Sequence, residues 1–185
     1  MTDEIIIDAE ERMEKSIAAL KTELSHIRTG KANPSLIDGI TVDYYGVPTP
    51  INQVANVSVP EPRLLTIQPW DKSMLKEIER AIQKSELGIN PNNDGTIIRL
   101  PMPQLTKETR EEYAKQARKK GEEGKVNIRN IRRNANDAVK KLEKSKEITE
   151  DEAANAADDI QKLTDKMIAD IEKITKDKET DIRSL

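Results

Sequence analysis

The sequence predicts an α+β protein in which a small β/α/β domain is inserted into an elongated three-helix bundle. Three long segments carry apolar residues at helical spacing. The helical pattern stops near residue 30 and resumes after residue 105, and the interval holds every proline of the chain together with strand-like alternation. We therefore assign residues 1–29 and 106–185 to the bundle, residues 32–104 to the inserted domain, and residues 29–32 and 104–106 to two hinges.

The first helix is predicted to span residues 2–29. Five apolar residues recur in steps of four and three and form one stripe: Met13, Ile17, Leu20, Leu24 and Ile27. Thr2 or Asp3 is expected to cap the start of this helix. Gly30 is expected to end it, because glycine is the usual residue just past a helix C-terminus.

The inserted domain is predicted to contain short strands and one helix. Strands are expected at residues 40–44, 54–59, 64–67 and 96–100, the second of them with an irregularity. The helix is expected to begin after Asp71 as its N-cap and to stop at Gly88. The residues from 90 to 95 form a cluster of turn residues.

The second and third helices are predicted to be the longest elements. Thr106 or Thr109 is expected to cap the second helix, which runs to about Ser145. Thr149 with Glu152 has the spacing of a capping box and begins the third helix. The apolar stripe of the third helix consists of Ala153, Ala156, Ile160, Leu163, Met167, Ile171 and Ile174.

Helices of this length make a thin rod. A helix of about 35–40 residues is about 55–60 Å long, and a three-helix rod of that shape leaves no room for a buried substrate pocket. Gly121 and Gly124 lie inside the second helix, where each should cost about 1 kcal/mol relative to alanine. The sequence leaves open whether they bend it.

Composition excludes several classes of function. The chain of 185 residues has no cysteine, which excludes disulfides, thiol catalysis and cysteine-ligated metals. The N-terminus lacks the basic and apolar stretches of a signal peptide, and no apolar run approaches the roughly 20 residues of a membrane span. We therefore expect a cytoplasmic protein.

The net charge of −3 hides two segments of opposite charge. Residues 110–133 hold nine Lys/Arg against four Glu, a net of +5, whereas residues 149–185 hold six Lys/Arg against eleven Asp/Glu, a net of −5. Within the basic segment, Arg129, Arg132 and Arg133 share one helical face, opposite the apolar residues of the stripe. No acidic residue occurs from position 124 to 136, so we interpret this face as a phosphate-binding surface rather than a solvated ion-pair network. RNA is the favoured ligand because no DNA-binding motif is present.

Other candidate residues favour structural roles. The carboxylates of Asp8, Glu10, Glu11, Asp158 and Asp159 fit solvated helix faces better than acid/base catalysis, which needs a cleft. His26 has no companion with which to bind a metal. Gly30 and Lys31 lack the first glycine and the preceding strand of a phosphate-binding loop. Tyr44 and Tyr45 can stack on bases, but packing within a small domain is the commoner use of such residues.

Several motifs in the right order are similar to those of the bacterial ribosome recycling factor family, over essentially the whole chain. They are the stretches at residues 28–36 (RTGKANPSL), 44–50 (YYGVPTP), 87–92 (LGINPN), 94–95 (DG), 98–101 (IRLP), 126–137 (VNIRNIRRNAND) and 162–165 (KLTD). The departures are Lys31 where the family often has Arg, Gln104 where Pro is frequent, and Asn134 where Asp is common. Lys31 keeps the positive charge but loses the planar guanidinium fork.

This resemblance implies an L-shaped molecule with a tRNA-like outline. It implies that the bundle lies along the large ribosomal subunit in the intersubunit space, and that the chain, with elongation factor G and GTP, splits the post-termination ribosome into subunits. It also implies that the chain is not an enzyme and needs no cofactor or metal. The residues expected to bind ribosomal RNA are Arg28, Lys31, Arg110, Arg129, Arg132 and Arg133, and those expected to form the hinges are Thr29, Gly30, Lys31, Ala32, Gln104, Leu105 and Thr106.

We further expect a monomer that binds neither DNA nor a membrane. The alternative from the residues alone is a helical adaptor that binds a protein partner through its charged faces without RNA. Salt-dependent binding to purified ribosomal RNA or subunits distinguishes the two.

Overall fold

The computed structural model describes residues 1–184 and divides into two compact units. The first comprises Met1–Ile27 with Arg110–Ser184, and the second comprises Arg28–Thr109. The first unit is built from long helices, and the strands of the described residues all lie in the second. The predicted α+β class is therefore confirmed.

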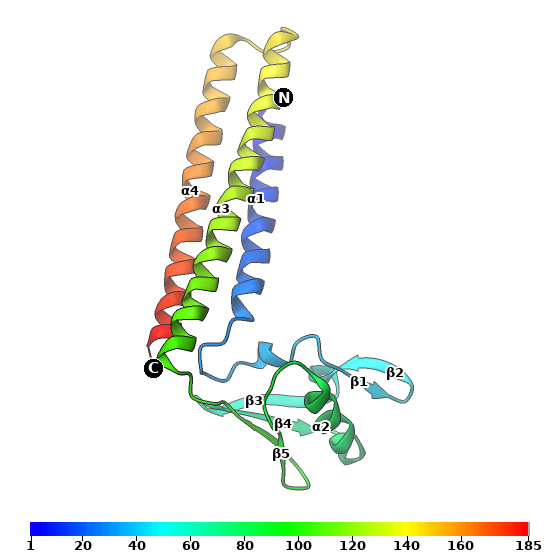
Figure 1. Cartoon of the computed structure of the whole chain (residues 1–185). Coiled ribbons are helices and arrows are strands. Elements are labelled where there is room, and N and C mark those ends of the chain that lie inside the picture. The colour runs from blue at the N-terminus through cyan, green and yellow to red at the C-terminus, as the bar shows by residue number, and fades with distance from the viewer. Residues whose placement is uncertain (185) are drawn as a thin grey trace. The chain divides into compact units, whose positions relative to one another are not determined.

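The helical unit consists of three helices that run side by side (Figure 1): α1 (Thr2–Ser25), α3 (Lys107–Lys144) and α4 (Glu150–Arg183). Its core holds the predicted apolar stripes, and the large side chains that are fully buried there are Met13, Ile128, Ile160, Ile171 and Ile182. The 38 residues of α3 form one continuous helix, about 57 Å long at about 1.5 Å per residue. The core is a narrow seam along these helices, as the spacing of apolar residues predicted.

The start of α1 at residue 2 is as predicted, but its predicted N-cap and its predicted end are wrong. Its N-cap is Met1, without a side-chain capping bond, so neither Thr2 nor Asp3 has that role. The helix ends at Ser25 rather than at Gly30, because the amides of His26 and Ile27 bond three residues back and close the last turn.

The other helix starts follow the capping rules. Thr149 Oγ1 accepts the amide of Glu152 at 3.1 Å, as predicted for the start of α4. For α3, Thr106 is the capping residue: its Oγ1 accepts the amide of Thr109 at 3.1 Å. The spacing of Thr109 with Glu112 therefore does not mark the helix start.

Gly121 and Gly124 allow α3 to approach its neighbours closely. A Cβ at Gly121 would lie 2.5 Å from Thr175 Oγ1 on α4, and one at Gly124 would lie 3.2 Å from Leu20 Cδ2 on α1. Both glycines are buried. The low helix propensity of glycine is thus offset by packing that a larger residue would prevent.

Replacing Gly121 with valine should lower the free energy of unfolding of the helical unit by about 1–3 kcal/mol, because the added side chain overlaps Thr175. The measurement is chemical denaturation followed by far-ultraviolet circular dichroism. The matched control is Asn127→Val at an exposed position of the same helix, where we expect a change within about 0.5 kcal/mol. Equal effects of the two substitutions would show that α3 tolerates bulk at Gly121.

The second unit contains two antiparallel sheets. The hairpin of β1 (Thr41–Tyr44) and β2 (Val47–Pro50) forms one, and the other has the order β3-β4-β6-β5. Its strands are β3 (Ala55–Glu61), β4 (Leu64–Pro69), β5 (Asn92–Asn93) and β6 (Ile98–Pro101). The irregularity predicted in β3 lies between Ser58 and Glu61. The two-residue β5 was not predicted because asparagine has a low strand propensity.

The helix of this unit packs its apolar side against the larger sheet. Asp71 Oδ1 accepts the amide of Ser73 at 3.0 Å and begins a short 3₁₀ turn (Lys72–Met74), which leads into α2 (Leu75–Lys84). The helix ends at Lys84 with Ser85 as its C-cap, earlier than the predicted stop at Gly88. The apolar core between this helix and the sheet includes Ile78, Ile82, Leu65, Ile67, Ile98 and Leu100.

Both chain segments that lead into the small unit are tied to the same turn between β3 and β4. The amide of Ala32 donates to the Pro62 carbonyl at 2.7 Å, and the amide of Met102 donates to the Arg63 carbonyl at 2.8 Å. The guanidinium of Arg63 donates back to the Met102 carbonyl at 3.0 Å. These bonds fix residues 32 and 102 to the small unit.

Asp94 closes the turn between β5 and β6. Its carboxylate accepts the amides of Ile97 (2.8 Å) and Thr96 (2.9 Å) and the guanidinium of Arg99 (2.6 Å). The bond from Ile97, followed by those from Arg99 and Thr96, lowers the pKa of Asp94 from 3.8 to about 2.

The small unit should therefore lose stability in acid. Because the folded pKa of Asp94 lies below its ordinary value, the ionised carboxylate stabilises the fold above about pH 4, and this contribution disappears as the pH falls toward 2. Hydrogen-exchange protection of β6 amides should decline through this window in the wild type and decline less in Asp94→Asn. An identical decline in both proteins would assign the acid sensitivity to other groups.

Candidate nucleic-acid interface

Arg129, Arg132 and Arg133 lie on α3, away from the core side chains of Ile128 and Ile131. Arg129 and Arg133 are exposed and Arg132 is half-buried. None of the ion pairs found within residues 1–184 involves these three guanidinium groups. The surface they form, which we call the arginine face, thus keeps its positive charge uncompensated by close carboxylates.

Contacts from α4 orient Arg132. Its Nη1 donates to Gln161 Oε1 at 3.0 Å, and Gln161 Nε2 donates to Asp165 Oδ1 at 2.8 Å. The Nε of Arg132 is buried and has no hydrogen-bond partner among the described residues. A guanidinium held in this way loses less side-chain entropy when its remaining donors meet an anion.

Three of the basic residues nearer the start of α3 form ion pairs with carboxylates. Lys125 Nζ lies 3.2 Å from a carboxylate oxygen of Glu122 and 3.2 Å from one of Glu172. Burial opposes the charge of Lys125, but the hydrogen bonds to these two carboxylates outweigh it and raise the pKa of the ammonium. The sequence shows no acidic residue from position 124 to 136. Lys125 nevertheless has an acidic neighbour from elsewhere in the chain, because Glu172 of α4 lies against it.

Two further cations of the basic segment have carboxylate partners. Arg118 lies 3.3 Å from Glu179 of α4, and Lys120 lies 3.7 Å from both Glu23 of α1 and Glu123. The positive charge of residues 110–125 is therefore weaker than the sequence suggests, although Lys115 and Lys119 take part in none of the ion pairs found within residues 1–184.

The other predicted RNA-binding residues are divided between the two units. Arg28 belongs to the small unit, where its guanidinium donates to the Leu87 carbonyl. Lys31 is exposed in the same unit, and its amide donates to Thr29 Oγ1 at 3.3 Å. Arg110 begins the second segment of the helical unit and is half-buried.

The described residues contain no group of three His, Asp or Glu side chains able to hold a metal ion. His26 is exposed, and Asp158 is paired with Lys162 at 3.1 Å rather than facing a cleft. Within residues 1–184, no helix is long and apolar enough to cross a membrane.

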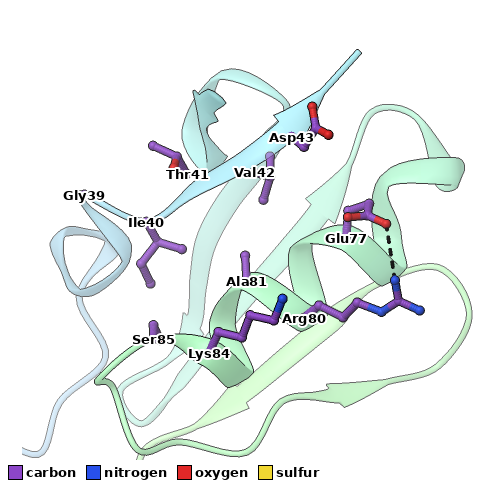
Figure 2. A pocket seen from close by; sticks show the side chains of 10 residues that line it. All are labelled: Gly39, Ile40, Thr41, Val42, Asp43, Glu77, Arg80, Ala81, Lys84 and Ser85. Atoms are coloured by element: carbon purple, nitrogen blue, oxygen red, sulfur yellow. Dashed lines mark ion pairs between the residues drawn. The ribbon is translucent and has the colours of Figure 1, made fainter. Parts of the chain in front are cut away.

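A groove of about 470 Å³ lies between β1 and α2 (Figure 2). Its charged side chains are those of Asp43, Glu77, Arg80 and Lys84, and Glu77 pairs with Arg80 at 3.6 Å. These side chains carry both signs of charge, and none of them forms the nucleophile–base hydrogen bond that covalent catalysis requires. We assign no chemistry to this groove.

The sequence interpretation missed the exposure of the aromatic residues on and near the β1–β2 hairpin. Tyr45 is 78% exposed and Trp70 is 65% exposed, whereas packing within the domain was the favoured expectation for the tyrosines. The dipeptide Tyr45-Gly46 at a two-residue turn is the signal that could have indicated this exposure.

Comparison with known proteins gives a consistent result over the whole chain. Residues 20–182 match a family model described as ribosome recycling factor. A ribosome-recycling factor from Brevibacillus brevis is 61% identical over 182 residues, covering 98% of each chain. One from Clostridium acetobutylicum is 55% identical over 185 residues, covering 100% of each.

Two solved structures are similar in fold and sequence. A solution structure of a ribosome recycling factor has a TM-score of 0.81 and 39% identity, and the match covers 100% of this chain and 98% of that one. A second match has a TM-score of 0.70 and 43% identity over 98% of each chain; its description is of models for the T. thermophilus ribosome recycling factor and the E. coli elongation factor G bound to the E. coli post-termination complex.

Proposed function

The chain belongs to the ribosome recycling factor family, and from this premise we propose that it splits post-termination ribosomes into subunits together with elongation factor G and GTP. Similarity to a recycling factor described on a post-termination complex with elongation factor G supports these partners. The chain contributes binding and geometry, and GTP hydrolysis belongs to the elongation factor.

The arginine face is the observation that carries the proposed binding mode. Arg129, Arg132 and Arg133 are uncompensated cations on a rigid helix, and such groups bind RNA phosphates through charge-assisted hydrogen bonds. We propose that this face lies against ribosomal RNA of the large subunit. Arg28, Lys31 and Arg110 are proposed to add contacts near the hinges.

The proposed mechanism uses the two units as separate bodies. The amides of Ala32 and Met102 are bonded to the small unit, so motion is confined to these two anchors and the residues between them and the helices. Rotation at residues 29–32 and 104–106 would let the small unit move while the arginine face holds the large subunit. Elongation factor G would supply the force that moves it.

A helical adaptor without RNA is the competing function, and salt dependence separates the two. If the arginine face binds phosphates, the logarithm of the affinity for purified large subunits should fall linearly with the logarithm of salt concentration, with a slope set by the number of phosphate contacts. An affinity that does not change with salt concentration would favour the adaptor. Binding that is lost when the ribosomal proteins are removed from the subunit would also favour it.

Splitting itself is tested by sedimentation. Post-termination ribosomes incubated with this chain, elongation factor G and GTP should appear as separate subunits on a density gradient, and omission of any one of the three should leave them intact. Intact ribosomes in the complete mixture, with elongation factor G from a matching organism, would contradict the proposed function.

A further inference from the structure

Gln161 on α4 is the side chain that holds Arg132 on α3. Of the three guanidinium groups of the arginine face, that of Arg132 is the one with a hydrogen bond to another side chain within residues 1–184. This bond joins Arg132 Nη1 to Gln161 Oε1 at 3.0 Å. Arg132 is therefore the guanidinium of this face whose position depends on a second helix.

Asp165 fixes which end of the Gln161 amide faces Arg132. The Nε2 of Gln161 donates to Asp165 Oδ1 at 2.8 Å. If the amide were turned over, its Nε2 donor would face the Nη1 donor of Arg132, and its Oε1 acceptor would face a carboxylate. Both bonds would then be lost, so together they select one orientation of the amide.

Gln161 holds Arg132 without neutralising it. An amide oxygen accepts a hydrogen bond but carries no charge, whereas a glutamate at this position would form an ion pair with the guanidinium. No ion pair joins Asp165 to Arg132 within the described residues. The other charged neighbours on α4, Asp158 and Lys162, are paired with each other at 3.1 Å. The positive charge of Arg132 thus remains available to an anion.

The donors that Arg132 can still offer are those of Nη1 and Nη2. A guanidinium has five N–H groups. Gln161 accepts from one of them, and the Nε of Arg132 is buried without a partner among the described residues. The other three N–H groups are enough for two parallel bonds to one phosphate. The bond to Gln161 is thus compatible with phosphate binding and restricts the direction from which a phosphate meets the guanidinium.

We propose that Gln161 is a positioning residue for Arg132 in the binding of ribosomal RNA phosphates, and that the position requires a neutral amide rather than a carboxylate. An arginine that is free in solvent loses rotamer freedom when it binds, and the bond to Gln161 removes part of that loss beforehand. This inference rests on the proposed function and deepens it, because it assigns a part in RNA binding to the acidic helix α4.

Gln161→Ala should lower the affinity for purified large ribosomal subunits by about 3- to 10-fold, because Arg132 regains its rotamer freedom. The slope of the logarithm of affinity against the logarithm of salt concentration should stay as in the wild type, since the number of phosphate contacts does not change. The matched control is Asn155→Ala, which removes an exposed amide from the same helix and should bind like the wild type. Wild-type affinity in Gln161→Ala would overturn the proposal.

Gln161→Glu tests the requirement for a neutral group, because it keeps the length of the side chain and adds a charge. The carboxylate competes with phosphate for the guanidinium of Arg132. The affinity should therefore fall by about 5- to 30-fold, and the salt slope should become shallower by about one unit. If Gln161→Glu bound as tightly as the wild type, any acceptor would suffice and the proposal would be wrong.

A double-mutant cycle separates positioning from a general effect on α4. In an Arg132→Ala background, Gln161→Ala should change the affinity by less than about twofold, because the group that it positions is absent. An equal loss in both backgrounds would show that Gln161 acts through the fold or by itself, which contradicts the proposal. If Arg132→Ala bound like the wild type, the proposed RNA contact of the arginine face and this inference would fail together. A loss in Arg132→Ala without one in Gln161→Ala would overturn this inference alone.

Discussion

Replacing Arg129, Arg132 and Arg133 together with glutamine is expected to weaken binding to purified large ribosomal subunits by about 10²- to 10⁴-fold. Each charge-assisted contact contributes on the order of 1–2 kcal/mol, and about 1.4 kcal/mol corresponds to tenfold in affinity. The slope of affinity against salt concentration should also become shallower by about one unit for each arginine that binds a phosphate in the wild type. The measurement is equilibrium binding at several salt concentrations.

A matched control distinguishes the arginine face from general electrostatic attraction. Lys166, Lys173 and Lys176 are exposed on α4, and replacing them with glutamine removes the same charge from the acidic helix. We expect the affinity to fall by less than about tenfold, since charges distant from phosphates are screened over about 8–10 Å. Equal effects of the two triple substitutions would show that net charge, and not this face, determines binding.

Locking the hinges is expected to reduce splitting to the level seen without the chain while binding to large subunits stays unchanged. Because the sequence contains no cysteine, one can be placed at residues 29–31 and one at residues 104–106 without competing thiols. Pairs that oxidise to a disulfide are selected by gel mobility, since the bond forms only when the Cα atoms lie about 4.4–6.8 Å apart. Light scattering of post-termination ribosomes then measures splitting.

The same protein after reduction is the control for this lock. Splitting should return when the disulfide is opened, because the hinge residues regain their torsional freedom. An oxidised variant that splits ribosomes as fast as its reduced form would contradict motion at residues 29–32 and 104–106 as the mechanism.

The helices and most strands could be predicted from the sequence because their signals are local. Apolar residues at helical spacing, such as Met13, Ile17 and Leu20, depend only on period, and Thr149 caps α4 through a residue three positions away. The end of α1 could not be predicted in this way. The helix ends where the amides of His26 and Ile27 bond three residues back. No glycine stands at this position in the sequence to indicate the end.

The candidate site was less predictable because its surroundings come from another helix. Glu172 compensates Lys125 and Gln161 orients Arg132, and both partners lie on α4, far along the chain. A local window around Arg129 contains neither. The same reason applies to Gly121, whose role becomes clear only when Thr175 is placed opposite it.

The central claim is that the arginine face holds the ribosome while it is split, and light scattering of post-termination ribosomes with elongation factor G and GTP tests it most directly. Wild type and Arg132→Ala are compared over a range of concentrations. The account predicts rapid splitting by the wild type and a requirement for about 5- to 150-fold more of the variant, as expected when one charge-assisted bond of about 1–3 kcal/mol is removed. Splitting by both proteins at the same concentration would contradict the assignment of this face, and splitting by neither would contradict the proposed function.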